Sequence, residues 1–128
     1  MTKPKVKSED LIAEVIKIAQ ANPEFVYDST WGCSYARLTG EGGSCLFGKA
    51  LSNLGVNEPT LKEIDAYEAT EVTIGALSDP DSEYDYPIDI IGTSEQAAAM
   101  QKAQQAQDNS KPWGKAIEPL LDFLSSTV

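Results

Sequence analysis

The stretch WGCSYARLTGEGGSCLFGKALSNLG, Trp31 to Gly55, decides how the fold of this 128-residue chain is read. It holds both cysteines and the densest run of glycines. Behind the glycines, apolar residues recur at helical spacing: Leu46, Phe47, Ala50, Leu51 and Leu54. Ser44 is placed to cap the start of this helix, and Gly55 to end it in a left-handed conformation. The stretch therefore predicts a short strand, a glycine-rich turn and a buried helix.

The rest of the chain predicts a mainly α fold, with about five helices around one core and a small β-hairpin near residues 25–38. The length fits a single domain, residues 1–128, of which residues 1–7 are expected to be flexible. Phe25–Tyr27 would pair with Tyr35–Leu38 in the hairpin. Ser78–Gly92 is expected to be a long loop. Helices are predicted over residues 8–21, 44–54, 61–68, 93–108 and 111–124, with one or two further helical turns in 70–77.

Charge is the unusual feature of the composition. Ten basic residues stand against 20 acidic residues, which gives a net charge of −10. A charge of this size repels phosphate backbones and anionic membranes, so we expect no direct nucleic-acid binding and no membrane association. The sequence contains neither an apolar run of about 18 residues nor a signal-peptide pattern. These observations predict a cytoplasmic protein.

The cysteines and glycines allow few catalytic or cofactor sites. The chain has no histidine, which excludes imidazole catalysis, and two cysteines are a poor match to structural zinc ligand sets. Cys33 and Cys45 could form a redox pair or a disulfide worth about 3 kcal/mol. Two reduced, half-buried thiols are the favoured alternative. The GEGGS turn lacks the Gly-Lys-Ser/Thr of a phosphate-binding loop, so no cofactor is predicted.

The acidic middle of the chain is its most informative feature. Glu58 to Asp89 contains ten carboxylates and a single lysine. A calcium loop within it is disfavoured, because Tyr84 and Ile90 stand where the glycine and the closing glutamate belong. Two interpretations stay open: a solvated face that aids solubility, or a docking patch for a basic partner. The candidate partner-binding residues are Asp79, Asp81, Glu83, Tyr84, Asp85, Tyr86 and Asp89.

Three motifs resemble a group of small proteins from actinobacteria and their phages. They are the Cys-x-Tyr of Cys33–Tyr35, the Ser-Cys-x-x-Gly-x-x-Leu of Ser44–Leu51, and the Gln-Asp…Trp-Gly-x-Ala of Gln107–Ala116. The resemblance covers about half of the chain. It implies a compact, mainly helical domain and carries no activity or functional residues over to this chain.

Together these features predict a non-enzymatic, acidic protein-binding module without catalytic residues. A phage accessory protein that inhibits or modulates a host nucleic-acid-binding or defence complex is the sharper version. Its partner would be a basic or nucleic-acid-binding protein. The alternatives are a redox-responsive protein that uses Cys33 and Cys45, and a structural subunit of an assembly.

Overall fold

The computed structural model describes residues 4–26, 45–65, 74–81 and 86–126. These residues confirm the mainly α fold with a small sheet. The helices are α1 (Ser8–Ala21), α2 (Leu46–Asn53), α3 (Glu58–Asp65), α4 (Ile74–Ser78), α5 (Ser94–Asp108), α6 (Trp113–Ala116) and α7 (Glu118–Ser126). The strands are β1 (Lys5–Lys7) and β2 (Asp89–Ile91).

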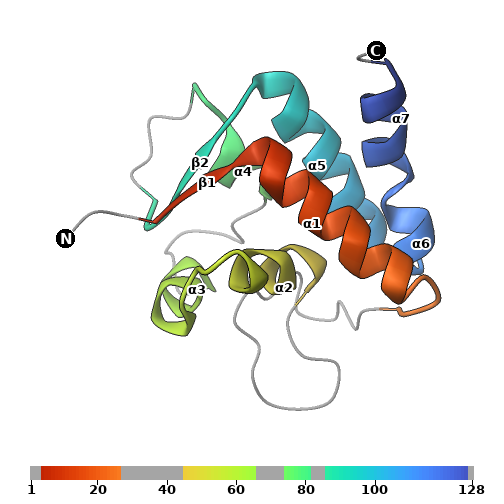
Figure 1. Cartoon of the computed structure of the whole chain (residues 1–128), viewed down its shortest axis with the longest axis horizontal. Helices are drawn as coiled ribbons and strands as arrows, with labels where there is room; N and C mark the ends of the chain where they lie inside the picture. Colours follow the sequence, from red (N-terminus) through yellow and green to blue (C-terminus); the bar gives the residue numbers. More distant parts are fainter. Residues whose placement is uncertain (1–3, 27–44, 66–73, 82–85, 127–128) are drawn as a thin grey trace.

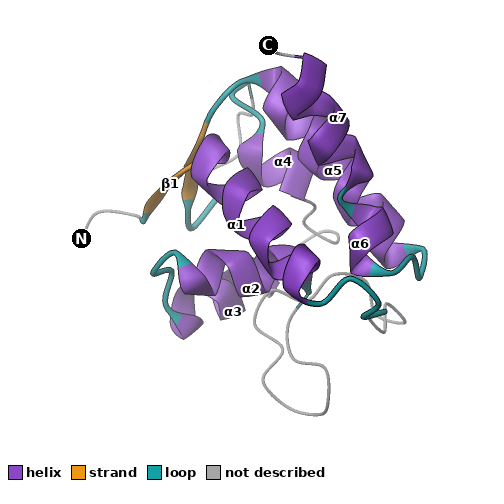
Figure 2. Ribbon diagram, turned by 45° about the vertical axis from the view of Figure 1, so that its right-hand side comes forward, coloured by secondary structure: helices purple, strands orange, loops and turns teal. Residues whose placement is uncertain are grey.

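Helix α5 is the central element of the fold. It contacts α1, α2, α4, α6 and α7. Helix α1 crosses in front of it, α6 and α7 lie along one side, and the two strands lie at the opposite end of the molecule (Figure 1). Helices α2 and α3 form a layer beneath α1 (Figures 1 and 2). The fully buried side chains with the largest volumes, Trp113 and Phe47 among them, fill the space between these helices.

The small sheet lies elsewhere than the predicted hairpin. β1 and β2 pair in parallel, with Val6 opposite Ile90. Phe25 and Val26 belong to no strand, and residues 27–38 lie outside the described residues. Two predictions change as a result: the flexible segment 1–7 contains β1, and the long loop Ser78–Gly92 contains β2. Both strands have three residues, which is too short for an alternating pattern to stand out.

Helix α1 forms over the predicted residues, 8–21. Leu11, Ile12, Val15 and Ala19 are buried, with acidic Glu9 and Asp10 in the first turn, where the helix dipole favours negative charge. The helix ends at Asn22, whose main-chain N–H donates to the carbonyls of Ile18 and Ala19. This helix buries one face against α2 and α5.

The cap at the start of helix α2 differs from the expected one, whereas the helix ends as expected. The N-cap is Cys45, whose sulfur accepts from the N–H of Gly48 at 3.4 Å, and Ser44 lies outside the described residues. Gly55 has a φ of 100°. Its N–H donates to Ser52 and that of Val56 donates to Leu51, which is the Schellman arrangement of a helix end. The prediction for Gly55 is confirmed.

Helix α5 begins with a complete capping box. The hydroxyl of Thr93 accepts from the N–H of Gln96 at 3.1 Å, and the amide oxygen of Gln96 accepts from the N–H of Thr93 at 2.8 Å. Thr93, the first residue of the predicted helix 93–108, is the residue that provides the cap. The helix runs without a break to Asp108.

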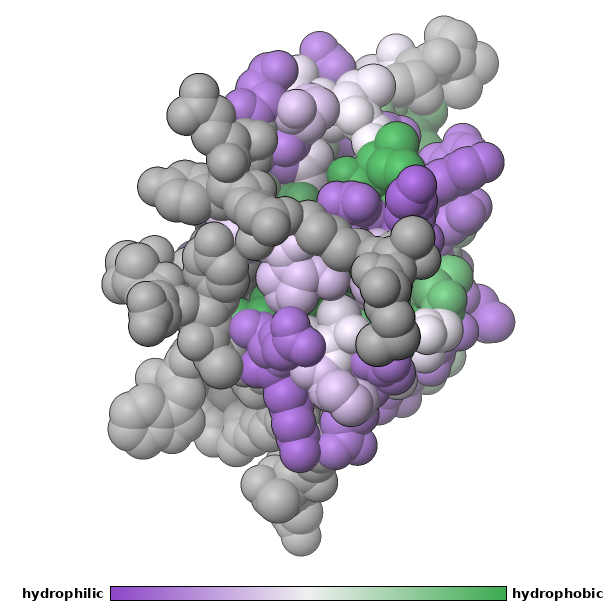
Figure 3. Space-filling view, turned by 90° about the vertical axis from the view of Figure 1, so that its left-hand side faces the viewer, coloured by the Kyte–Doolittle hydropathy of each residue, from purple (hydrophilic) through white to green (hydrophobic). Residues whose placement is uncertain are grey.

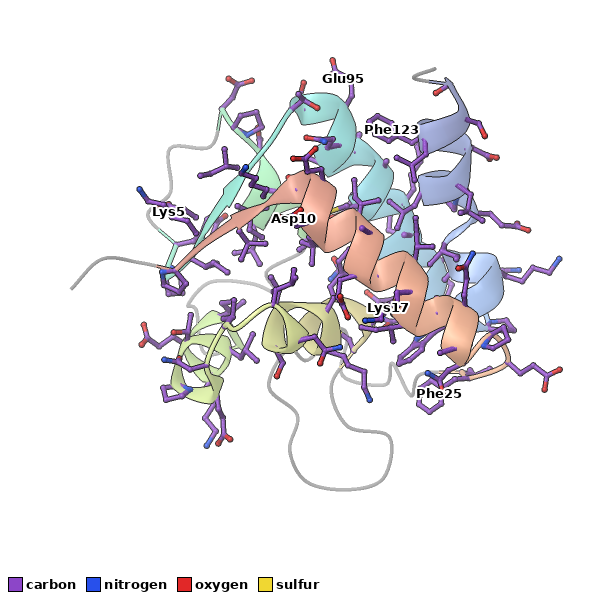
Figure 4. The ribbon with its side chains drawn as sticks, in the orientation of Figure 1. Lys5, Asp10, Lys17, Phe25, Glu95 and Phe123 are labelled. Atoms are coloured by element: carbon purple, nitrogen blue, oxygen red, sulfur yellow. The ribbon has the colours of Figure 1, made fainter. Side chains whose placement is uncertain are left out.

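The predicted C-terminal helix is divided into α6 and α7. Ile117 ends α6, and Pro119 occupies the first turn of α7. Proline is tolerated there because the N–H that it lacks would have no acceptor within the helix. Among the apolar residues of this region, Ile117 and Leu120 are buried, whereas Leu121 and Leu124 are exposed. Phe123 packs against the core in their place and lies between α5 and α7 (Figure 4).

None of the helices in the described ranges combines the length and the apolar character that crossing a membrane requires.

Candidate protein-docking site

Three of the predicted partner-binding residues lie around one hollow. Asp79, Tyr86 and Asp89 all line a cavity of about 390 Å³ beside β2. Asp81 is exposed two residues beyond Asp79 but does not line the hollow. Glu83, Tyr84 and Asp85 lie outside the described residues. Of the four predicted residues that the structure describes, three therefore lie together and Asp81 lies outside the hollow, and their binding of a partner stays a prediction.

The end of α4 forms one wall of the hollow. The hydroxyl of buried Ser78, the last residue of α4, donates to the carbonyl of Ile74 at 2.6 Å. A carboxylate oxygen of Asp79 then accepts from the N–H of Asp81 at 2.9 Å, which closes a turn of the Asx type around Pro80. This local bonding fixes the main chain of the turn and leaves Asp79 exposed at the rim.

Strand β2 forms the other wall and supplies an apolar surface to it. Ile88, which precedes the strand, and Ile90 within it are buried, whereas the side chain of Ile91 is 55% exposed. A large aliphatic side chain this exposed, next to carboxylates, offers area that a partner can desolvate. The hollow therefore combines negative charge with apolar contact area.

Lys5 brings the one positive charge among the residues that line the hollow. It reaches this place because β1 pairs with β2 in the register that sets Lys5 opposite Asp89. Its side chain extends from the outer side of the sheet, away from the helices (Figure 4). On the end of the molecule that carries the strands, the described residues combine hydrophilic side chains with pale ones and a few hydrophobic patches (Figure 3). Sequence reasoning missed Lys5 and Ile91, because their position follows from strand pairing between distant segments.

Cys45 is a buried, disulfide-bonded residue. The reduced state that the sequence favoured for both thiols therefore does not hold for Cys45. Cys33, the other cysteine of the chain, lies outside the described residues. Cys45 has a second structural role, because its sulfur caps the start of α2. Whether a redox response uses this bond stays a prediction.

Other parts of the described surface offer less definite sites. A cavity of about 640 Å³ is lined by Lys111 and Lys115 but also by Glu118 and Asp122, so its charges are balanced. In the described ranges, no three side chains of the metal-ligating types histidine, cysteine, aspartate and glutamate gather closely enough to hold an ion. The hollow beside β2 is thus the place where the predicted residues, apolar exposure and excess negative charge coincide.

Comparison of the chain with models of protein families, with curated proteins and with solved structures finds no match. The resemblance to small actinobacterial and phage proteins therefore stays a prediction that rests on the three motifs.

Proposed function

We propose that this chain is a non-enzymatic, cytoplasmic protein-binding module that docks a basic segment of a partner protein at the hollow beside β2. The observation that carries the proposal is the convergence of Asp79, Tyr86 and Asp89 on this one hollow, next to exposed Ile91. Carboxylates steer a basic partner and set its register, while aromatic and aliphatic groups supply the desolvated contact.

The charge of the whole chain supports the same conclusion. A net charge of −10 attracts basic surfaces over roughly one Debye length, about 8 Å at physiological ionic strength. Proteins that bind nucleic acid present such basic surfaces. In the sharper form of the proposal, the chain is a phage accessory protein whose carboxylates occupy the phosphate-binding surface of a host nucleic-acid-binding or defence complex.

The experiment that tests the proposal is a capture from nuclease-treated actinobacterial lysate, eluted with a salt step. The tagged wild-type chain is compared with the double variant Asp79→Asn/Asp89→Asn. The matched control is Glu118→Gln/Asp122→Asn, whose residues line the cavity beside α6 and α7. Each pair removes two negative charges, so the two variants differ in the place of the change and agree in total charge.

The proposal predicts a basic protein in the salt eluate of the wild type and of the control, and its loss from the hollow variant. Equal recovery with all three chains would overturn it, because total charge would then explain the capture. An empty wild-type eluate would favour the solvated-face interpretation of the acidic segment.

The disulfide of Cys45 favours a redox-responsive protein as a second candidate function. Because the Cys45 sulfur also caps α2, a change in its bonding state acts directly on the start of a buried helix. Titration of thiols in the native protein over a series of thiol–disulfide buffers tests this candidate. A reversible transition within the cytoplasmic range supports it, and a bond that resists reduction throughout that range removes it.

A further inference from the structure

The hollow follows the edge of β2 that faces away from β1. All five consecutive residues from Ile88 to Gly92 line it. Successive side chains of a strand point to opposite faces, so a hollow that touches five in a row runs along the edge of the strand. The opposite wall comes from Leu77, Asp79 and Pro80 at the end of α4. Lys5 of β1 reaches the hollow as well, but every other lining residue comes from β2 and its flanks or from the segment at the end of α4. Because α4 contacts β2, the hollow borders the edge of β2 that faces away from β1.

The main chain of β2 presents hydrogen-bonding groups to this edge. The N–H of Asp89 donates to the carbonyl of Pro4 at 3.0 Å, which directs the groups of Asp89 toward the N-terminal strand. Main-chain groups alternate between the two edges of a strand, so the N–H and C=O of Ile90 point away from β1. Among the described residues, β2 pairs with β1 alone. Such an edge is a template for a further strand.

We infer that the partner's basic segment binds here as an extended strand, which adds to the edge of β2 and fills the hollow. The inference rests on the proposed function and gives it a binding mode. In strand addition, main-chain hydrogen bonds provide affinity and alternate side chains provide specificity. Within the described ranges, the two three-residue strands pair only with each other and form a marginal sheet, which a third strand would stabilise.

The two faces of the sheet define the chemistry of the segment that fits. On the outer face, the added strand would lie near Asp79 at the rim and half-buried Asp89, which has Lys5 of β1 opposite it. The two carboxylates outnumber the one lysine, so a lysine or arginine of the added strand finds an excess of negative charge there. On the inner face it would meet buried Ile88, Ile90 and Leu77, where an aliphatic side chain fits. A segment that alternates basic and aliphatic residues satisfies both faces.

The test uses two synthetic peptides and the full-length, isotope-labelled chain. The first peptide is acetyl-Lys-Val-Lys-Val-Lys-amide. The second has the same sequence with every internal amide N-methylated, so that it keeps its charge and side chains but cannot donate to a strand. NMR records the amide shift and the hydrogen-exchange rate of Ile90, with the Ile12 amide in the core of α1 as the internal control.

Strand addition predicts that the first peptide shifts the Ile90 amide and slows its exchange at least about tenfold at saturation, while Ile12 is unchanged. The N-methylated peptide should bind at least about tenfold more weakly. Equal binding of both peptides, weakened about tenfold by Asp79→Asn/Asp89→Asn, would overturn strand addition and leave the charge-based docking site intact. Failure of both peptides to bind would overturn the docking site as well.

Discussion

The side-chain oxygen of Gln107 in α5 accepts a hydrogen bond from the main-chain N–H of Leu46, the first residue of α2, at 2.7 Å. Gln104, one turn earlier, accepts in the same way from the N–H of Ile74 at the start of α4, at 2.8 Å. Gln101 accepts from Gly75 at 2.8 Å. One row of glutamines on the central helix thus satisfies the free donors of two neighbouring helix starts.

These hydrogen bonds give the glutamines a structural role, and the substitution Gln107→Leu tests that role. Gln107 is fully buried, and its own amide group is oriented by a bond to Asp108 at 2.8 Å. Leucine would leave the N–H of Leu46 buried without its acceptor, which costs about 1–3 kcal/mol. Urea unfolding should show a lower midpoint with an unchanged slope.

The control for this substitution is Gln105→Leu on the exposed side of the same helix. Its free energy of unfolding should change by less than about 0.5 kcal/mol. If both variants lose the same stability, the effect belongs to helix propensity and not to the bond between α5 and α2.

Gly55 is expected to be the most restrictive position at the end of α2. Its φ of 100° lies where a Cβ is disfavoured, although no atom lies within 4 Å of the position that a Cβ would occupy. Gly55→Ala should therefore cost about 1 kcal/mol through backbone strain alone. Asparagine tolerates positive φ better than alanine, so Gly55→Asn should lose less stability than Gly55→Ala. Thermal unfolding measures the difference. Equal stability of the alanine variant and the wild type would show that the Schellman end contributes nothing.

The disulfide of Cys45 should stabilise the chain against unfolding. Removing a native disulfide from a small domain costs about 2–5 kcal/mol, mainly because the unfolded chain regains freedom. Unfolding in urea with and without a reductant measures this difference, and Cys45→Ser should reproduce the reduced midpoint or fall below it because the cap on Gly48 also changes. An unchanged midpoint on reduction would argue against any stabilising part for the bond.

The sequence was sufficient for the long helices and insufficient for the contacts between distant segments. Periodic apolar residues and capping residues predicted α1 and α5 close to their observed ends. The sheet escaped prediction, because β1 and β2 are short and each gains its partner from the far end of the sequence. The roles of Gln104 and Gln107 were missed for the same reason. A glutamine in an alanine-rich helix predicts an exposed side chain, and its role as an acceptor depends on a distant segment.

The candidate site was predictable in part. The density of carboxylates indicated Asp79 and Asp89, and the interleaved aromatics indicated Tyr86. Lys5 and Ile91 enter the site through parallel strand pairing, which leaves no local pattern in the sequence. The charge of the site was thus visible in the chain, whereas its apolar component and its strand edge were not.

The central claim, that carboxylates of the hollow dock a basic segment, is tested most directly by titrating the fluorescently labelled Lys-Val peptide into three chains. These are the wild type, Asp79→Asn/Asp89→Asn and Glu118→Gln/Asp122→Asn, each measured at about 0.05 M and 0.5 M salt. We expect the hollow variant to bind about tenfold more weakly at low salt, since the exposed charge of Asp79 and the half-buried charge of Asp89, at up to about 1 kcal/mol each, reach that factor. The control variant should stay within about twofold of the wild type, and high salt should remove most of the difference. Equal weakening in both variants, or affinity that does not respond to salt, would contradict the claim.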